Sequence, residues 1–393
     1  MQNLSLRISA IALGLVGLLL FTVQRQASPS SGETPHGTIP DMVSAIQNND
    51  FECTTGYYTQ TNALSKTVYI PDDWNLVTIT GTPRIQSARV NFAKRCDGDA
   101  HVERISGIDS LLVEAQDLEK LPLPGKLFDV AFYQQISATV GGAYSLSGWM
   151  LSLCGGSNVP NDCPPTYYMA KMLGIDPTGG TDPLASRVVW VEDRQNFIEN
   201  GKRIGWKNLR TSAIAQATTI TIFVRINSPF QWHGNHAFID ALSLVRAPLA
   251  DLTLPATITA TNQMTVAWSG VQSPDVTTIP GGTYTLYFDV QYRQASAAGW
   301  KDLVNGAQNA GSTLFTARCA NTTYEFRVRA RAEQPPAPPE GASPNQRYPG
   351  VWSEPTAVFF QSAPLATAPF TVTTPLTGEQ QIFLPLVQNG IEC

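Results

Sequence analysis

Apolar and polar residues alternate along many short segments of this chain of 393 residues. The clearest segment is residues 219–226, where isoleucine or valine occupies every second position from Ile220 to Ile226. A period of two turns one face of a β-strand toward a core and the other away from it. The same alternation occurs in residues 143–150, 264–269, 284–293 and 324–331, and residues 238–245 form a further strand-like run. No segment sustains a helical period, so the sequence predicts an all-β protein.

The strand-like segments fall into two blocks, residues 43–248 and residues 250–361. The first holds many short strands separated by turn residues over roughly 200 residues, which predicts a β-sandwich. The second holds long strands with an apolar and a polar face, as in half-buried antiparallel sheets. The blocks join near residues 246–251, and we predict two separately folding β-domains.

One stretch in the first block is rich in turn-forming residues. Residues 173–183 read LGIDPTGGTDP and precede the strand-like RVVWV of residues 187–191. Proline removes donors, glycine relaxes the backbone, and Asp and Thr bond to nearby amides, which predicts a shaped loop rather than a helix or regular strand. Two interpretations stay open: a tight turn held by its own side chains, or a rim where Asp176 and Asp182 bind a metal ion or ligand.

The two ends of the chain differ in composition from the blocks. Arg7 precedes an almost uninterrupted apolar run over residues 8–23. Residues 1–27 are therefore expected to be a signal peptide or, since no clear cleavage site follows, a membrane anchor. Residues 28–42 predict a flexible spacer. Residues 362–393 form a Thr- and Pro-rich tail, and its apolar segment 381–387 resembles a terminal attachment motif of exported bacterial proteins; a docked strand is the alternative.

Charge and cysteine content narrow the range of functions. A formal net charge of −5 leaves no basic stripe to neutralise phosphates, which argues against nucleic acid as a partner. Six cysteines in an exported chain predict disulfides, and a zinc site is the alternative, although no CxxC spacing occurs. The candidate pairs are Cys154 with Cys163, Cys53 with Cys96, and Cys319 with Cys393.

Four segments of the first block together resemble the galactose-binding-like jelly roll, a fold that includes many carbohydrate-binding modules. They are NDFE at 49–52, YQQI at 133–136, GAYSLSGW at 142–149 and HAFID at 236–240. In that fold the first and last strands lie side by side and often hold a structural calcium ion. The resemblance implies calcium as a cofactor, with Glu52 and Asp240 as metal ligands and backbone carbonyls supplying most of the shell. Both could instead be ordinary polar strand residues.

A sugar site is the second implication of this resemblance. The C–H face of a pyranose stacks on an aromatic ring while polar neighbours bind its hydroxyls. Trp149 is the candidate platform, because alternation places it with Ser145 and Ser147 and opposite Leu146 and Met150; core packing is the alternative.

The loop before the last strand of the first block offers further candidates. Residues 230–236 read FQWHGNH, and Trp232, His233, Asn235 and His236 could bind sugar hydroxyls or a metal ion. Two histidines without a third ligand make a poor zinc site. Hydrogen bonds that fix the loop are the favoured alternative.

The second block resembles a fibronectin type III domain, an immunoglobulin-like β-sandwich. Trp268 corresponds to the core tryptophan of the second strand, residues 323–330 to the strand of the tyrosine corner, and residues 351–355 to the start of the last strand. The Pro-rich stretch 334–348 departs from the family by lengthening one loop. Such domains are spacers or interaction modules, and the arginine row around Arg327 is expected to be a solvated face or to stack on Trp352.

Catalytic motifs are missing from the sequence. No GxSxG elbow, HExxH helix or phosphate loop occurs. Neighbouring carboxylates such as Glu192 and Asp193 would point to opposite faces of a strand. We therefore predict a non-catalytic protein, exported and either secreted or attached to the cell surface, that binds an extracellular or cell-wall glycan. The alternatives are a structural envelope or adhesion protein that contacts other envelope proteins, and a glycan-cleaving jelly roll.

Overall fold

The computed structural model describes residues 45–53, 56–87, 104–107, 109–115, 127–153, 165–196, 198–199, 202–203, 205–229, 235–255, 258–276, 283–334 and 347–361. Within these ranges the chain is built from β-strands, together with a short 3-10 turn, η1 (Pro165–Tyr167). No helix in the described ranges is long and apolar enough to cross a membrane. The all-β prediction is confirmed. The expected signal peptide or anchor, the spacer and the tail lie outside the described residues.

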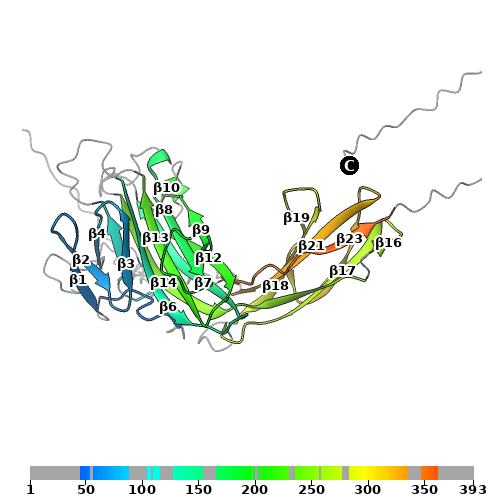
Figure 1. The fold of residues 1–393 in the computed structure, drawn as a ribbon, viewed down its shortest axis with the longest axis horizontal. Helices are drawn as coiled ribbons and strands as arrows, with labels where there is room; N and C mark the ends of the chain where they lie inside the picture. Colours follow the sequence, from blue (N-terminus) through cyan, green and yellow to red (C-terminus); the bar gives the residue numbers. More distant parts are fainter. Residues whose placement is uncertain are drawn as a thin grey trace, which may run out of the picture.

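The first half of the chain forms a sandwich of two five-stranded sheets (Figure 1). The β6 sheet has the order β3 (Asn75–Thr80), β6 (Phe128–Ser137), β13 (Thr219–Ser228), β8 (Ala170–Asp176) and β9 (Val189–Asp193). The β7 sheet has the order β12 (Lys207–Ile214), β7 (Ala143–Leu153), β14 (His236–Arg246), β5 (Leu111–Glu114) and β4 (Arg84–Ser87). Two small pairs are added, β1 (Tyr57–Thr61) with β2 (Thr67–Pro71) and β10 (Ile198–Glu199) with β11 (Lys202–Arg203).

Alternation along the strands explains how this sandwich closes. The apolar positions of β13, including Ile220 and Val224, point into a core that also contains Leu146 and Met150 of β7. The alternate residues of β13, such as Arg225, lie on the outer side of the β6 sheet. The strands predicted at 219–226, 143–150 and 238–245 are all present, within β13, β7 and β14.

The second half forms another sandwich. One sheet has the order β15 (Leu249–Thr253), β17 (Gln263–Val271) and β20 (Gly311–Thr316). The other has β16 (Ile258–Thr259), β23 (Thr356–Phe360), β21 (Thr322–Glu333), β18 (Thr285–Gln294) and β19 (Lys301–Gln308), and β22 (Arg347–Pro349) also pairs with β21. Trp268, Phe288 and Phe326 pack in its core, as the alternation predicts.

One sequence expectation about the first block is wrong. Leu173 to Asp176 were expected to belong to a loop, but they are the last four residues of β8, which pairs with β13 and β9. The loop begins only at Pro177. The strand continues because Leu173 and Ile175 are fully buried and Gly174 faces a tryptophan ring that leaves no room for a side chain.

The junction between the sandwiches holds a small apolar cluster. Val245 of β14 packs with Val276, Ala332 and Tyr348 of the second half, and Tyr284 lies against them. The Tyr348 hydroxyl is 3.0 Å from Ser243 Oγ. Segments distant in sequence, rather than residues 246–251, supply this contact between the sandwiches.

Candidate functional site

Aromatic residues gather on the outer face of the β6 sheet. One transverse row of paired residues crosses all five strands: Asn75, Tyr133, Phe223, Gly174 and Trp190. The Trp190 and Phe223 rings have centroids 5.7 Å apart, and those of Tyr133 and Phe223 are 6.0 Å apart. Phe223 is fully buried, whereas Tyr133 and Trp190 are half-buried. The two outer rings thus flank a shared aromatic floor. We call Tyr133, Phe223, Trp190 and the polar residues beside them the outer-face patch.

Gly174 allows this arrangement. A Cβ atom at Gly174 would lie 2.6 Å from Cε3 of Trp190, closer than side-chain atoms approach one another. The indole therefore lies over the backbone of β8. A larger residue at position 174 would lift the ring away from the sheet.

Polar side chains with fixed orientations border the rings. Arg225 donates to Asp129 through Nε at 2.8 Å and through Nη2, and Asn227 Nδ2 donates to the same carboxylate at 2.9 Å. The hydrogen bond to Asp129 raises the pKa of Arg225 above its ordinary value. The guanidinium carbon lies 5.9 Å from the Trp190 ring centroid. These contacts orient a planar polar group beside an aromatic ring.

The loop between β8 and β9 closes one side of the patch. Ala185 and Val188 pack with Phe223, Tyr133 and Trp190. Gln135 Nε2 donates to the carbonyl of Gly179 at 2.7 Å. The loop part of the turn-rich stretch 173–183, which begins at Pro177, therefore borders the outer-face patch.

Asp176 and Asp182 act within this loop as turn-forming residues. Asp176 is fully buried and accepts hydrogen bonds from Thr178 N at 2.8 Å, Thr178 Oγ1 at 2.7 Å and Arg187 Nε at 2.7 Å. Asp182 is exposed and accepts from Leu184 N at 2.9 Å. This geometry matches the tight turn, the first of the two interpretations.

The structure brings together the two predicted metal ligands, Glu52 and Asp240. β14 has a bulge between Asp240 and Ser243, with Ala241 at a φ of 50°, and the N-terminal segment pairs with it through Leu242 N and Asn49 O at 2.9 Å. Asp240 Oδ2 accepts from Ile105 N at 2.6 Å and from Ser106 N at 2.8 Å. Glu52 Oε1 accepts from Asp109 N at 3.2 Å. The two carboxylates therefore accept hydrogen bonds from backbone amides that are close in sequence, those of residues 105, 106 and 109.

Acidic side chains lie close together at this site. Burial raises the pKa of Asp240 well above its ordinary value, and the nearby Glu52 adds to the shift. Burial, followed by Asp109, Glu52 and Asp240, also raises the pKa of Tyr57. A bound cation would favour the ionised carboxylates and lower these pKa values.

The donor set here consists of oxygens, which suits calcium rather than a softer metal. In the described part of the chain no three His, Cys, Asp or Glu side chains form a group that could hold a metal ion. Glu52 and Asp240 would therefore need backbone carbonyls and water to complete a shell. Calcium stays a prediction.

Trp149, the predicted sugar platform, lies on the β7 face opposite Met150, as the alternation requires. It is only 8% exposed, and its ring does not present an open face. Trp232 and His233 lie outside the described residues.

Asn235 and His236 occupy structural positions. Asn235 is fully buried and its Nδ2 lies 3.1 Å from Ser228 Oγ. His236 Nε2 lies 2.7 Å from Glu114 Oε2. Burial alone would raise the pKa of Glu114, but His236 and Arg84 outweigh it and lower the pKa. Most of the loop 230–236 lies outside the described residues, so the role predicted for it stays a prediction.

Of the six cysteines, Cys53 and Cys319 lie in the described residues, and the predicted disulfides stay predictions. The other four cysteines, and with them the three predicted pairings, fall outside the described residues.

Sequence reasoning missed the outer-face patch as a site. The available signal was Phe223, an aromatic residue on the polar side of a strand whose other side is isoleucine and valine. Nothing in the sequence pairs it with Tyr133 or Trp190.

The fold and its geometry define an all-β protein with two sandwiches. No protein-family model matches the chain, and no curated protein matches it in sequence.

Comparison with solved structures matches the chain to a carbohydrate-binding module, a tailspike domain and an adhesin domain. TmCBM61, in complex with beta-1,4-galactotriose, is 16% identical, and the match covers 52% of this chain and 98% of the module at a TM-score of 0.30. The enzymatically active domain of tailspike protein 4 of bacteriophage CBA120 is 13% identical over 51% of this chain and 21% of that protein, at a TM-score of 0.29. The adhesin domain of Epf from Streptococcus pyogenes is 11% identical, and the match covers 82% of this chain and 97% of that domain at a TM-score of 0.26. These similarities assign neither a family nor a function to the chain.

Proposed function

We propose that this protein is an exported, non-catalytic surface protein that binds carbohydrate through its first sandwich. In this proposal the first sandwich is a galactose-binding-like jelly roll. The second is a fibronectin type III domain that acts as a spacer or interaction module. The partner is an extracellular or cell-wall glycan.

The outer-face patch is the observation that carries the proposal. Two half-buried rings, Tyr133 and Trp190, flank a buried phenylalanine on one face of a sheet. Sugar rings present apolar C–H faces that stack on such rings. Arg225, held by Asp129, places N–H donors beside Trp190, where sugar hydroxyls would lie, and Asn227 donates to the same carboxylate. A broad face of this kind suits a chain of sugars better than a single small molecule.

The experiment screens the full chain on a glycan array and then measures affinity for the best ligand by calorimetry. Trp190→Ala and Tyr133→Ala are expected to weaken binding by roughly 1–3 kcal/mol each, similar to exposing a large apolar side chain. Trp300→Ala is the matched control, because Trp300 lies in the second sandwich between Arg293 and Arg327. Its affinity should equal that of the unmodified protein.

Trp149→Ala separates the two candidate platforms. Since Trp149 is nearly buried, its truncation is expected to lower the melting temperature. If Trp149→Ala instead loses glycan binding at an unchanged melting temperature, Trp149 is the sugar platform and the outer-face patch is not. Absence of any glycan ligand would favour the structural envelope or adhesion role.

A further inference from the structure

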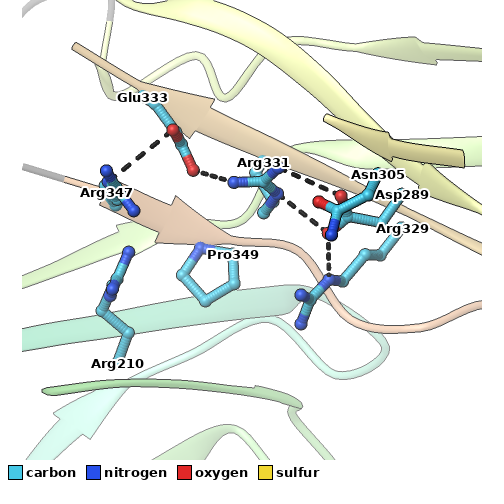
Figure 2. A pocket seen from close by; sticks show the side chains of 8 residues that line it. All are labelled: Arg210, Asp289, Asn305, Arg329, Arg331, Glu333, Arg347 and Pro349. Carbon is cyan, nitrogen blue, oxygen red and sulfur yellow. Dashed lines mark hydrogen bonds and ion pairs between the residues drawn. The ribbon is translucent and has the colours of Figure 1, made fainter. Parts of the chain in front are cut away.

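A cavity of about 290 Å³ lies where the two sandwiches meet (Figure 2). Its lining comes from both halves of the chain. Arg210 of β12 belongs to the first sandwich, and the others to the second: Asp289, Asn305, Arg329, Arg331, Glu333, Arg347 and Pro349. The volume is near the lower limit of small-molecule sites, which span roughly 300–1,000 Å³. It is separate from the outer-face patch, because β12 belongs to the opposite sheet of the sandwich.

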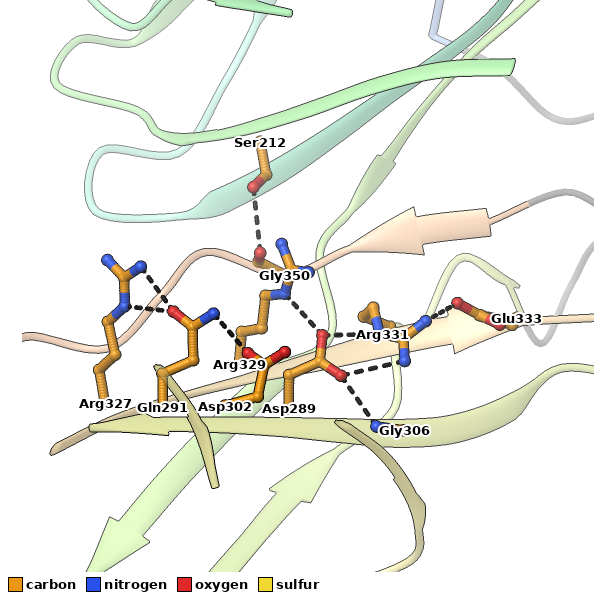
Figure 3. Close-up of polar contacts among 10 residues, drawn as sticks. All are labelled: Ser212, Asp289, Gln291, Asp302, Gly306, Arg327, Arg329, Arg331, Glu333 and Gly350. Atoms are coloured by element: carbon orange, nitrogen blue, oxygen red, sulfur yellow. Dashed lines mark hydrogen bonds and ion pairs between the residues drawn. The ribbon is translucent and has the colours of Figure 1, made fainter. Parts of the chain in front are cut away.

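Both carboxylates of the lining are already engaged by arginines. Asp289 accepts from Arg329 Nε at 2.9 Å, from Arg331 Nη2 at 3.0 Å and from Gly306 N at 3.0 Å (Figure 3). Glu333 pairs with Arg331, and Arg347 Nε lies 3.6 Å from its other oxygen. The lining has four guanidinium groups and two carboxylates, so four minus two leaves a surplus of two positive charges.

Arg210 supplies the least compensated of these charges. Among the described residues it takes part in no hydrogen bond or ion pair, and Figure 2 draws its guanidinium without a partner below Arg347. Burial, followed by the neighbouring positive charge of Arg347, lowers the pKa of Arg210 to about 10. An oxyanion bound in the cavity would stabilise the charged form of Arg210 and raise its pKa again.

The surrounding contacts fix the pocket before any ligand arrives. Ser212, two residues after Arg210, lies with its Oγ 3.1 Å from the Gly350 carbonyl oxygen, which joins β12 to the chain after β22. A side chain at position 350 would not fit, since its Cβ would lie 2.4 Å from the Pro248 carbonyl oxygen. Arg329 also stacks on Trp352, with the guanidinium carbon 4.6 Å from the ring centroid. Preorganised donors lose little entropy on binding.

We propose that this pocket binds the oxyanion group, carboxylate or sulfate, of an acidic saccharide. A guanidinium presents parallel N–H donors that match the two oxygens of such a group. Arg210 donates to the anion from the first sandwich, and Arg347 faces it from the second. The amide of Asn305 is available for a sugar hydroxyl. The saccharide part rests on the proposed function, whereas the anion part rests only on the pocket.

The test titrates the full chain with three probes at low ionic strength: sodium glucuronate, glucose and sodium sulfate. Glucuronate and glucose differ only in the carboxylate. We expect glucuronate to bind and glucose to leave the pocket empty. Arg210→Gln should weaken glucuronate binding at least about tenfold, the effect of losing a charge-assisted hydrogen bond. Arg347→Gln serves as a second variant, since the Arg347 side chain is 41% exposed. Arg104→Gln, which removes one exposed charge outside the pocket, is the control.

The outcomes separate the parts of the proposal. Equal binding of glucuronate by the Arg210→Gln variant and the unmodified protein would overturn it, as would binding of neither glucuronate nor sulfate. Sulfate binding without glucuronate binding would overturn the saccharide part and support the anion part. Arg210→Gln should leave array binding of a neutral glycan unchanged, and Trp190→Ala should leave sulfate binding unchanged. Failure here is thus distinguishable from failure of the proposed function.

Discussion

Phe223 shows which properties of a single residue the sequence predicts and which it does not. Its strand alternates strictly, so its position on the outer face could be predicted from the sequence. That position alone suggested a polar, solvated surface. In the structure Phe223 is fully buried, because Tyr133 and Trp190 from neighbouring strands cover it. Which residues share a row depends on strand pairing, and single-strand periodicity carries no information on pairing. Trp149 is the reverse case, a tryptophan that the pattern places outside the core and that is nonetheless nearly inaccessible.

Asp129 allows a prediction at the same scale. Its carboxylate is 6% exposed and takes both N–H donors of the Arg225 fork. Asp129→Ala would leave the guanidinium, itself 16% exposed, without its counter-charge. We expect a loss of about 2–4 kcal/mol in the free energy of unfolding of the first sandwich. Urea denaturation measures this loss.

The control removes an exposed ion pair from the same sheet. Glu192 pairs with Arg194, and both side chains are largely solvated. Glu192→Ala should cost less than about 1 kcal/mol. Equal effects of the two substitutions would mean that the Asp129 network adds no stability.

At the scale of elements, the sequence predicted strands more reliably than their ends. The run around Asp176 is half strand and half loop, since burial of Leu173 and Ile175 outweighs the turn-forming residues that follow. The predicted neighbourhood of the N-terminal segment and the last strand is present, through hydrogen bonds between Asn49 and Leu242. The bulge that turns Asp240 toward residues 105–106 could not be predicted, because it depends on this pairing.

The predicted calcium site lies between the N-terminal segment and β14, and calcium binding there can be tested by melting. A cation held by Glu52 and Asp240 would offset their mutual repulsion, and a ligand bound only by the folded state raises its stability. We expect calcium to raise the melting temperature of the first sandwich and a chelator to lower it. Differential scanning calorimetry gives both values.

Variants show whether these carboxylates carry the calcium effect. Glu52→Gln should melt at the same temperature with and without chelator. Asp182→Asn, which alters an exposed turn, should keep the full response to calcium. The site is excluded if the unmodified protein melts identically in calcium and in chelator.

Two sandwiches were evident from the sequence at the scale of the whole molecule, but their contact was not. The junction at residues 246–251 predicted two separately folding domains, and this segment consists of the end of β14, two connecting residues and the start of β15. Contact comes from β22, which begins at the end of the Pro-rich stretch that sets the second block apart from the fibronectin pattern. Arg210, the unpaired arginine of the pocket, likewise acquires its environment only when the halves meet. Local patterns predict each half, and the site between them depends on residues far apart in the chain.

Tyr348 provides the test of whether the halves unfold together. It is fully buried at the junction, packs against Val245 and lies within hydrogen-bond distance of Ser243. Tyr348→Ala should remove about 3–5 kcal/mol of packing, as for other large aromatic residues. Its thermal transition should split in two, and limited proteolysis should release fragments of roughly 200 and 110 residues. Tyr348→Phe keeps the ring, loses only the hydroxyl contact of about 1 kcal/mol, and should unfold like the unmodified protein. If the unmodified protein already shows two independent transitions, the junction does not couple the sandwiches, and the pocket between them would open without unfolding either one.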